Sequence, residues 1–205
     1  MGIQIGLTGG MGCGKSTALA IFKRLGARVV ETDALVKTLL RNDAGLKAEI
    51  GAAFGGEILD AEGNIDREAL GRRVFADSRD LRVLESLVHP RVRDLWMAHL
   101  RETHPLLVVE IPLLFENGLE THFTQTICVS CTPSVQKKRL MARGMTAAEI
   151  SNRTKRQLPT EEKVRRATIT LHNNGSVEHL EEQIKWALAS IRQSWPTEER
   201  DLLNT

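Results

Sequence analysis

Short apolar runs alternate with segments of helical periodicity along this chain. Residues 3–7 alternate between apolar and polar or small side chains, and this period of two predicts a strand. Apolar residues recur at helical spacing over 19–25, and Gly26 is expected to end that helix. Residues 27–32 then predict a second strand. A strand, a helix and a strand in succession form a βαβ unit, which requires a parallel sheet.

The same pattern continues toward the end of the chain. Continuous apolar and β-branched runs predict further strands at residues 106–111, 126–130 and 168–171. A last amphipathic helix is expected from residue 177 onward. The sequence therefore predicts an α/β fold with a parallel five-stranded sheet and flanking helices.

A long helical insertion is expected between the second and third strands, over residues 33–103. Asp66 follows a turn-rich stretch and is expected to cap the helix after it. His89 and Pro90 are interpreted as the start of another helix, because proline is common at the first helical position.

A second helical segment, residues 137–165, is strongly basic. Ten Lys and Arg residues stand against three Glu over residues 137–166, although the net charge of the whole chain is only +2. Such a segment either meets an anionic ligand or forms a solvated helical face, and composition does not choose between them. Thr146 and Glu149 are expected to form a capping box within it.

The loop after the first strand carries the most specific motif. Residues 9–16 read Gly-Gly-Met-Gly-Cys-Gly-Lys-Ser, which matches G-x-x-x-x-G-K-[ST] between a strand and a helix. Glycines let successive N–H groups face a phosphate, and the helix N-terminus adds positive potential. Lys15 is expected to reach the β- and γ-phosphates, and the hydroxyl of Ser16 to ligate Mg²⁺. The motif predicts the binding of a nucleotide with Mg²⁺, and ATP is the nucleotide expected if the protein is a kinase.

The motif is called a P-loop, and other residues indicate to which class of P-loop protein the chain belongs. A GTPase should carry N-K-x-D for guanine, and that string does not occur. A kinase needs an acceptor for the proton of the hydroxyl it phosphorylates, and Asp33 at the end of the second strand is the candidate, or else it caps a helix. Glu110 either faces the metal or pairs with a lysine. Arg139 is a candidate for stabilising the charge of the transferred phosphoryl group.

The three cysteines and the remaining composition indicate the compartment. No disulfide framework is possible with Cys13, Cys128 and Cys131, which fits a reducing environment. Cys128 and Cys131 form a C-x-x-C, but Cys128 lies in a predicted strand and no second pair of zinc ligands follows. No export signal and no run long enough to span a membrane is visible, so a cytoplasmic location is expected.

With these residues in view, the chain resembles the dephospho-coenzyme A kinase family. The resemblance runs from Gly6 to about Leu180 and includes residues 6–17, Asp33, and His89-Pro90 with Arg93. It continues through Ile-Pro-Leu-Leu-Phe-Glu at 111–116, which is the most discriminating string. Further matches are Gln136 with Arg139 and Arg143, Gln157 with Pro159, Glu162-Lys163, and Asn-Gly-Ser at 174–176. It implies a P-loop NTPase fold whose acceptor is dephospho-coenzyme A, with no nucleic-acid, membrane or obligate protein partner.

The resemblance also implies which part of the chain performs which role. The core would comprise 1–32, 104–136 and 166–205, the acceptor domain 33–103 and the lid 137–165. Catalysis would rest on Asp33, Lys15 and Arg139, with Asp33 taking the proton from the ribose 3′-hydroxyl. ATP would be held by Gly10, Gly12, Cys13, Gly14, Lys15, Ser16, Thr17, Asn174 and Gly175. The acceptor would be held by Asp33, His89, Arg93, Pro112, Leu113, Leu114 and Glu116.

Several departures from the family pattern and two rival functions accompany this interpretation. Thr32 stands where alanine is common, and Thr168 and His172 stand where acidic residues are usual. Cys13 stands where the family usually has serine, and Glu110 where aspartate is usual. A kinase of the shikimate or gluconate type would also place an aspartate after the second strand, but is not expected to carry residues 111–116 as they stand. A nucleic-acid-binding ATPase would use the basic segment instead, and its affinity would fall steeply with salt.

Overall fold

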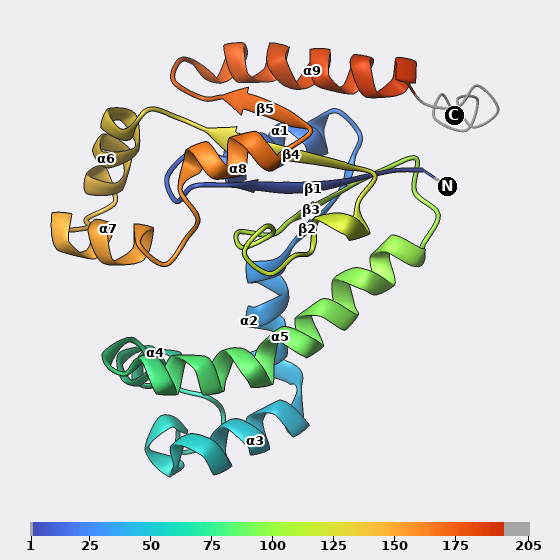
Figure 1. Ribbon diagram of the computed structural model, residues 1–205. Coiled ribbons are helices and arrows are strands. Elements are labelled where there is room, and N and C mark those ends of the chain that lie inside the picture. Colours follow the sequence, from blue (N-terminus) through green and yellow to red (C-terminus); the bar gives the residue numbers. More distant parts are fainter. Residues whose placement is uncertain (1, 195–205) are drawn as a thin grey trace. The chain divides into compact units, whose positions relative to one another are not determined.

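A five-stranded sheet lies at the centre of one of the two units of the structure, a computed structural model that describes residues 2–194 (Figure 1). This unit comprises Met1–Val30 and Thr103–Thr205, and the second unit comprises Glu31–Glu102. The strand order is β2-β3-β1-β4-β5. The strands are β1 (Ile3–Gly9), β2 (Arg28–Glu31), β3 (Leu106–Glu110), β4 (Gln125–Ser130) and β5 (Ile169–His172).

The predicted parallel sheet is confirmed. β1 is in the middle and pairs in parallel with β3, where Leu7 is level with Glu110, and with β4, where Gly9 is level with Val129. The carboxyl ends of these strands therefore meet at one edge, where ligands bind in open α/β sheets. The loop that begins at Gly9 starts from that edge.

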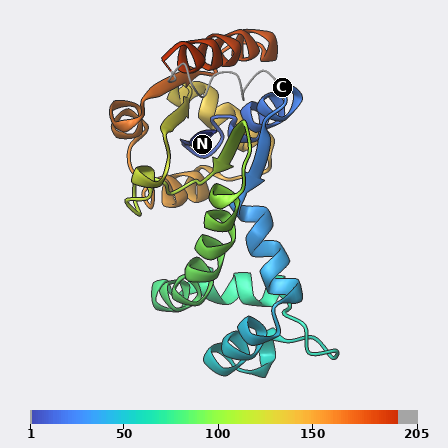
Figure 2. The ribbon, with the colours of Figure 1, turned by 90° about the vertical axis from the view of Figure 1, so that its right-hand side faces the viewer.

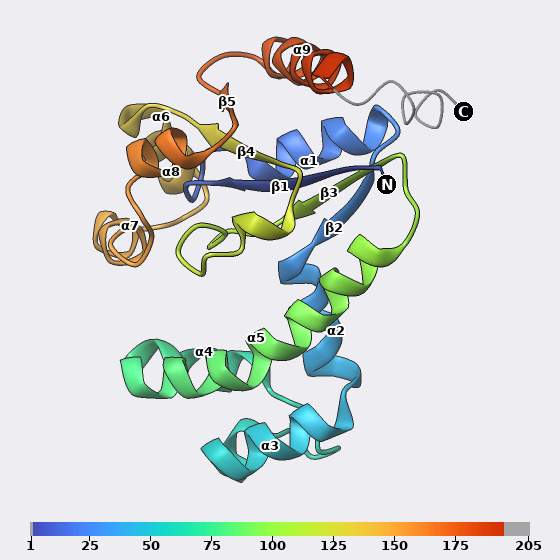
Figure 3. The ribbon, with the colours of Figure 1, turned by 45° about the vertical axis from the view of Figure 1, so that its right-hand side comes forward.

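The two faces of β1 carry different residues because side chains alternate along a strand. Ile3, Ile5 and Leu7 are buried in a cluster with residues of α1 (Lys15–Arg24) and α9 (Val177–Ser194). Figure 3 shows both helices on that side of the sheet. On the other face, a Cβ at Gly6 would lie 2.8 Å from the ring of Phe123, so the segment after β3 packs directly on the backbone.

Three short helices connect β4 to β5: α6 (Pro133–Ala142), α7 (Ala147–Thr154) and α8 (Thr160–Arg166). Thr132 caps α6, and Thr146 with Glu149 forms the predicted capping box of α7. The short η2 (Glu120–His122) precedes β4. Within residues 2–194, none of the helices combines the length and apolar character needed to cross a membrane.

The second unit is helical (Figure 2). It contains α2 (Thr32–Asn42), α3 (Ala44–Phe54), η1 (Gly56–Ile58), α4 (Arg67–Ala76) and α5 (Ser78–Arg101). The other α-helices of the unit each pack against α5. Asp66 caps α4 as predicted, by accepting hydrogen bonds from the amides of Glu68 and Ala69.

The predicted helix start at His89 and Pro90 is wrong. Pro90 lies inside α5, which runs unbroken from Ser78 to Arg101. A proline inside a helix removes one backbone donor and crowds the preceding turn. The buried face that Val88, Val92 and Trp96 form on α5 outweighs this cost.

A lysine side chain is completely buried in the interior of the first unit. Lys163, on α8, has no exposed side-chain surface. Its ammonium group donates to the carbonyl of Pro112 at 2.9 Å and lies 2.8 Å from a carboxylate oxygen of Glu116. A buried charge is tolerated only when it is paired and hydrogen-bonded, and these contacts provide both conditions. The pair fixes α8 to the segment after β3.

Replacing Lys163 by Met should lower the free energy of unfolding by about 3–5 kcal/mol, because the carboxylate of Glu116 is left in the interior without its counter-charge. Denaturant titration measures the change. The matched control is Lys185→Met, whose side chain is 48% exposed, and it should shift stability by no more than about 0.5 kcal/mol.

Adding Glu116→Gln to Lys163→Met should restore part of the loss, since the double variant buries no unpaired charge. If Lys163→Met is as stable as Lys185→Met, the ion pair does not hold these segments together.

Candidate nucleotide-binding site

The loop between β1 and α1 ends in a helix without a side-chain cap. Gly14 is the N-cap of α1, with φ 97° and ψ 30°, and as a glycine it supplies no side-chain cap. That turn also contains no acidic residue. The positive end of the helix is therefore available to an anion.

The carbonyl oxygens of this loop are held by surrounding donors. The carbonyl of Gly9 accepts from the ammonium of Lys15 at 3.1 Å, that of Met11 from the amide side chain of Gln136 at 2.7 Å, and that of Cys13 from Asn173 at 2.9 Å. In the described part of the chain, no protein atom accepts from the amides of Gly12, Gly14 or Ser16. The loop thus presents donors and turns its acceptors to the protein, which is the arrangement a phosphate requires.

Gly14 is required by both backbone geometry and space. Its φ lies in the left-handed region, where residues other than glycine are strained. A Cβ at this position would also lie 2.1 Å from the side-chain nitrogen of Asn173. Any larger residue at position 14 would therefore strain the backbone and displace the Asn173 side chain.

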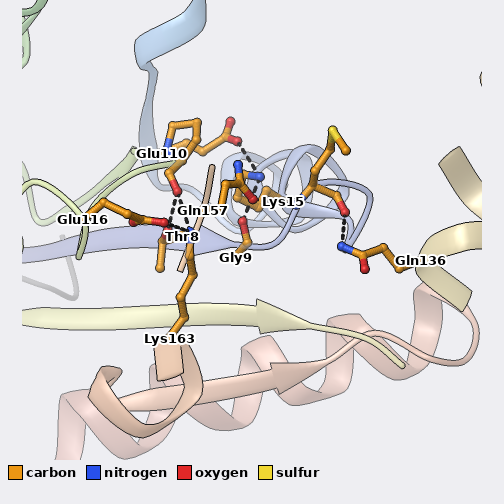
Figure 4. Close-up of polar contacts among 10 residues, drawn as sticks. Thr8, Gly9, Lys15, Glu110, Glu116, Gln136, Gln157 and Lys163 are labelled. Carbon is orange, nitrogen blue, oxygen red and sulfur yellow. Dashed lines mark hydrogen bonds and ion pairs between the residues drawn. The ribbon is translucent and has the colours of Figure 1, made fainter. Parts of the chain in front are cut away.

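Lys15 and Glu110 form an ion pair next to the loop (Figure 4). The ammonium of Lys15 lies 3.9 Å from a carboxylate oxygen of Glu110, at the end of β3, and both side chains are largely buried. Of the two roles predicted for Glu110, pairing with a lysine is the one observed. The partner is the motif lysine itself, so Glu110 helps to determine where its charge lies.

Gln157 of the predicted lid and Gln136, the residue just before the lid, contact the loop at Met11 (Figure 4). Gln136, on α6, donates to the Met11 carbonyl, and the side-chain oxygen of Gln157, between α7 and α8, accepts from the Met11 amide at 3.3 Å. Arg139, also on α6, donates to the backbone carbonyl of Asn173 at 2.9 Å. These contacts attach the start of α6 and the segment between α7 and α8 to the phosphate loop, and attach Arg139 to the turn beside that loop.

The segment 112–116 lies beside the same edge of the sheet. The carboxylate of Glu116 accepts from the Leu158 amide at 2.8 Å in addition to its contact with Lys163. The carbonyl of Pro112 accepts from the hydroxyl of Thr8 at 3.2 Å. Pro112 and Leu113 are half-buried, whereas Leu114 is fully buried. These residues connect β1, the segment after β3 and the end of the lid.

Asn174 and Gly175 lie in the exposed turn after β5. The side chain of Asn174 accepts from the backbone amide of Thr132, the residue that caps α6. A Cβ at Gly175 would have no neighbour within 4 Å. The turn is therefore fixed to the start of α6 on one side and open on the other.

Three predicted site residues belong to the helical unit. Asp33 lies in the first turn of α2, two residues after the end of β2, with an exposed side chain. The alternative that Asp33 caps this helix is wrong, because Glu31 is the N-cap residue. His89 and Arg93 are both exposed on α5, four residues apart and so on one helical face.

The structure brings the predicted loop residues together with Arg139 and with residues 112–116 in the first unit. It also reveals contacts from Asn173 and Thr8, which the sequence analysis did not single out, and it gives Gln136 and Gln157 a partner that the resemblance did not predict. For Asn173 the available signal was its position directly after a strand at the ligand-binding edge. Within residues 2–194, no group of three or more His, Cys, Asp or Glu side chains is placed to hold a metal ion.

Comparisons with known proteins find relatives in one enzyme family. The family model described as dephospho-CoA kinase matches residues 3–179. A dephospho-CoA kinase of Anaeromyxobacter dehalogenans is 41% identical over 196 residues, with 92% of each chain covered. One of Thermus thermophilus is 41% identical over 191 residues, again with 92% of each covered.

Solved structures give the same result. A crystal structure from Thermus thermophilus has a TM-score of 0.79 at 40% identity and covers 93% of this chain and 98% of its own. Dephospho-CoA kinase from Campylobacter jejuni has a TM-score of 0.69 at 28% identity, with the same coverage. A shikimate kinase from Acinetobacter baumannii, at 13% identity and a TM-score of 0.56, shares the fold alone.

The family model spans most of the chain, and the matched region contains both the phosphate loop and the segment 111–116. Relatives at about 40% identity align over nearly the full length of both proteins. This chain therefore belongs to the dephospho-CoA kinase family.

Proposed function

We propose that this protein transfers the γ-phosphate of ATP to the ribose 3′-hydroxyl of dephospho-coenzyme A, giving coenzyme A. The observation that carries the proposal is the phosphate loop, whose amides at Gly12, Gly14 and Ser16 are available while its carbonyls are held by the protein. Membership of the family supplies the identity of the acceptor. Both substrates are small polar molecules. We assign the activity to the cytoplasm.

The triphosphate would be held mainly by backbone donors. We assign this role to Gly10, Gly12, Cys13, Gly14, Lys15, Ser16 and Thr17. The role of Lys15 is supported by its place at the edge of the sheet, where Glu110 and the carbonyl of Gly9 contact its ammonium group. Asn174 and Gly175, in the open turn after β5, would border the adenine.

A magnesium ion fits the residues present. Ser16 is in the first turn of α1 with its side chain exposed, and its hydroxyl is a hard oxygen ligand of the kind Mg²⁺ prefers. When bound, the ion would supply positive charge to the β- and γ-phosphate oxygens.

We assign the proton transfer to Asp33. Its carboxylate would accept the proton of the 3′-hydroxyl as the oxygen attacks phosphorus, which makes that oxygen a better nucleophile. The side chain is exposed and does not cap α2, so no backbone amide of that helix occupies it. Arg139 would stabilise the charge on the transferred group, and its contact with Asn173 keeps it at the tip of β5.

Acceptor binding is assigned to the helices of residues 33–103, through His89 and Arg93, and to the segment 112–116. Exposed cationic and imidazole side chains on α5 suit the phosphate groups of a coenzyme A precursor. Pro112, Leu113 and Glu116 retain exposed surface, whereas Leu114, being buried, would act by holding the backbone of this segment in place. Residues 137–165 would close over the nucleotide as a lid.

Acceptor specificity tests the proposal directly. Purified protein supplied with Mg·ATP should convert dephospho-coenzyme A to coenzyme A, with the product identified by mass. Shikimate and gluconate should give no product above the ATPase background. Phosphorylation of shikimate without that of dephospho-coenzyme A would contradict the assignment. Salt-sensitive binding of RNA or DNA would favour a nucleic-acid ATPase instead.

The assignment of Asp33 as the base can be tested by replacing its carboxylate with an amide. Asp33→Asn should lower kcat by roughly 10²–10⁴-fold, the usual contribution of a general base, while calorimetry shows the same affinity for ATP. Glu31→Gln, an exposed neighbour whose side chain makes no capping bond, is the matched control and should leave kcat unchanged. A kcat of Asp33→Asn equal to that of the control would remove Asp33 from the chemistry.

A further inference from the structure

Two cysteines that are distant in sequence meet at the phosphate loop. The sulfur atoms of Cys13 and Cys131 lie 3.3 Å apart, although the residues are 118 positions apart in the chain. Cys13 belongs to the loop itself, and Cys131 directly follows β4. A disulfide needs a sulfur separation of about 2.05 Å, so a small movement would bring these atoms within bonding distance.

The C-x-x-C motif does not form this pair. Cys13 lies in the apolar cluster on the α1 and α9 side of the sheet, and Cys131 packs against that cluster. Cys128 is buried but does not belong to the cluster. The motif thus separates its two thiols, and the fold provides Cys131 with a different partner.

We propose that Cys13 and Cys131 are a reversible oxidation site, which hydroperoxides convert to a disulfide that restrains the phosphate loop. Cys131 is the entry point, since it is partly exposed while Cys13 and Cys128 are fully buried. The buried thiol of Cys13 then serves as the resolving group.

The chemistry balances with a hydroperoxide as the only oxidant. The thiolate of Cys131 attacks an oxygen of the peroxide, the O–O bond breaks, and water or an alcohol leaves after taking a proton. The sulfur of Cys13 attacks the resulting sulfenic acid, loses its own proton, and displaces hydroxide, which leaves as water. The two thiols together lose two electrons and two protons, and the peroxide is reduced.

The surroundings keep the pair reduced under ordinary conditions. Burial, together with the hydrogen bond to Cys13, raises the pKa of the Cys131 thiol to about 12, and nearby Arg139 acts in the opposite direction. Because the thiolate is the reacting form, oxidation is slow at neutral pH without a strong oxidant.

The disulfide would act on the phosphate loop because that loop cannot relax freely. The carbonyl of Cys13 is held by Asn173, and its amide donates to the carbonyl of Gly10 at 3.2 Å. A Cβ at Gly10 would lie 3.0 Å from the Cys13 sulfur, so the loop is closely wrapped around this side chain. Drawing the sulfur toward Cys131 therefore displaces the neighbouring amides, and displacements of about 1 Å at a reacting centre can lower a rate by about 10²-fold.

The test follows the crosslink and the activity separately. The full-length protein, freed of reductant, is treated with hydrogen peroxide, and the remaining thiols are alkylated. Peptide mass spectrometry should find Cys13 linked to Cys131, with the loss of two hydrogens. Turnover of dephospho-coenzyme A should fall by about tenfold or more, and dithiothreitol should restore both the mass and the rate.

Matched variants identify the pair. Cys131→Ser should have normal turnover before treatment, form no crosslink, and keep its activity through the same exposure. Cys128→Ala should behave as the unchanged protein does, because Cys128 has no part in the bond. Thermal melting of each variant before treatment verifies that it is folded, and Cys131→Ala replaces any serine variant that is not.

A crosslink between Cys128 and Cys131, the absence of any crosslink at Cys13, or full crosslinking without loss of Mg·ATP affinity or turnover would overturn the proposal. The effect on turnover rests on the proposed function, whereas the mass of the crosslinked peptide does not. A protein that forms the crosslink but fails to phosphorylate dephospho-coenzyme A even when reduced would therefore contradict the function and leave the oxidation site intact.

Discussion

The nucleotide-binding site depends on how the peptide groups of the loop between β1 and α1 are oriented. Between β1 and α1, carbonyl oxygens turn toward the protein and are held there by Lys15, Gln136 and Asn173, so that the amides of the loop are left for a ligand. These donors come from α1, from α6 and from the turn after β5. The sheet order, with β1 between β3 and β4, is what brings such distant segments to one loop.

Local patterns in the sequence predicted much of this arrangement. The strands, the phosphate loop, the cap at Asp66 and the capping box at Thr146 all depend on residues within a few positions of one another, and the structure confirms them. The helix start at Pro90 failed for a related reason. Proline has a clear local preference, but the buried face of α5 is a property of the whole helical unit and outweighs it.

The contacts that the sequence patterns missed are long-range. Asn173 meets Cys13 across 160 positions, Gln157 meets Met11 across 146, and the two thiols meet across 118. No periodicity reports such pairs, because their side chains are polar or small and lie in loops or at element ends. The resemblance to a family named some of these residues, Gln157 among them, but not the contacts that they make. The roles of the individual site residues remain predictions.

Binding of Mg·ATP to a Gly14→Ala variant tests the central claim most directly. The added Cβ would displace the Asn173 side chain, which holds the Cys13 carbonyl, and would strain a backbone conformation unsuited to alanine. Both effects should move the loop amides out of line with the phosphates. Calorimetry should show the affinity reduced by about tenfold to a hundredfold for each amide–phosphate hydrogen bond lost, while circular dichroism shows an unchanged fold. An affinity equal to that of the unaltered protein would contradict the account, because the loop would then not be what holds the nucleotide.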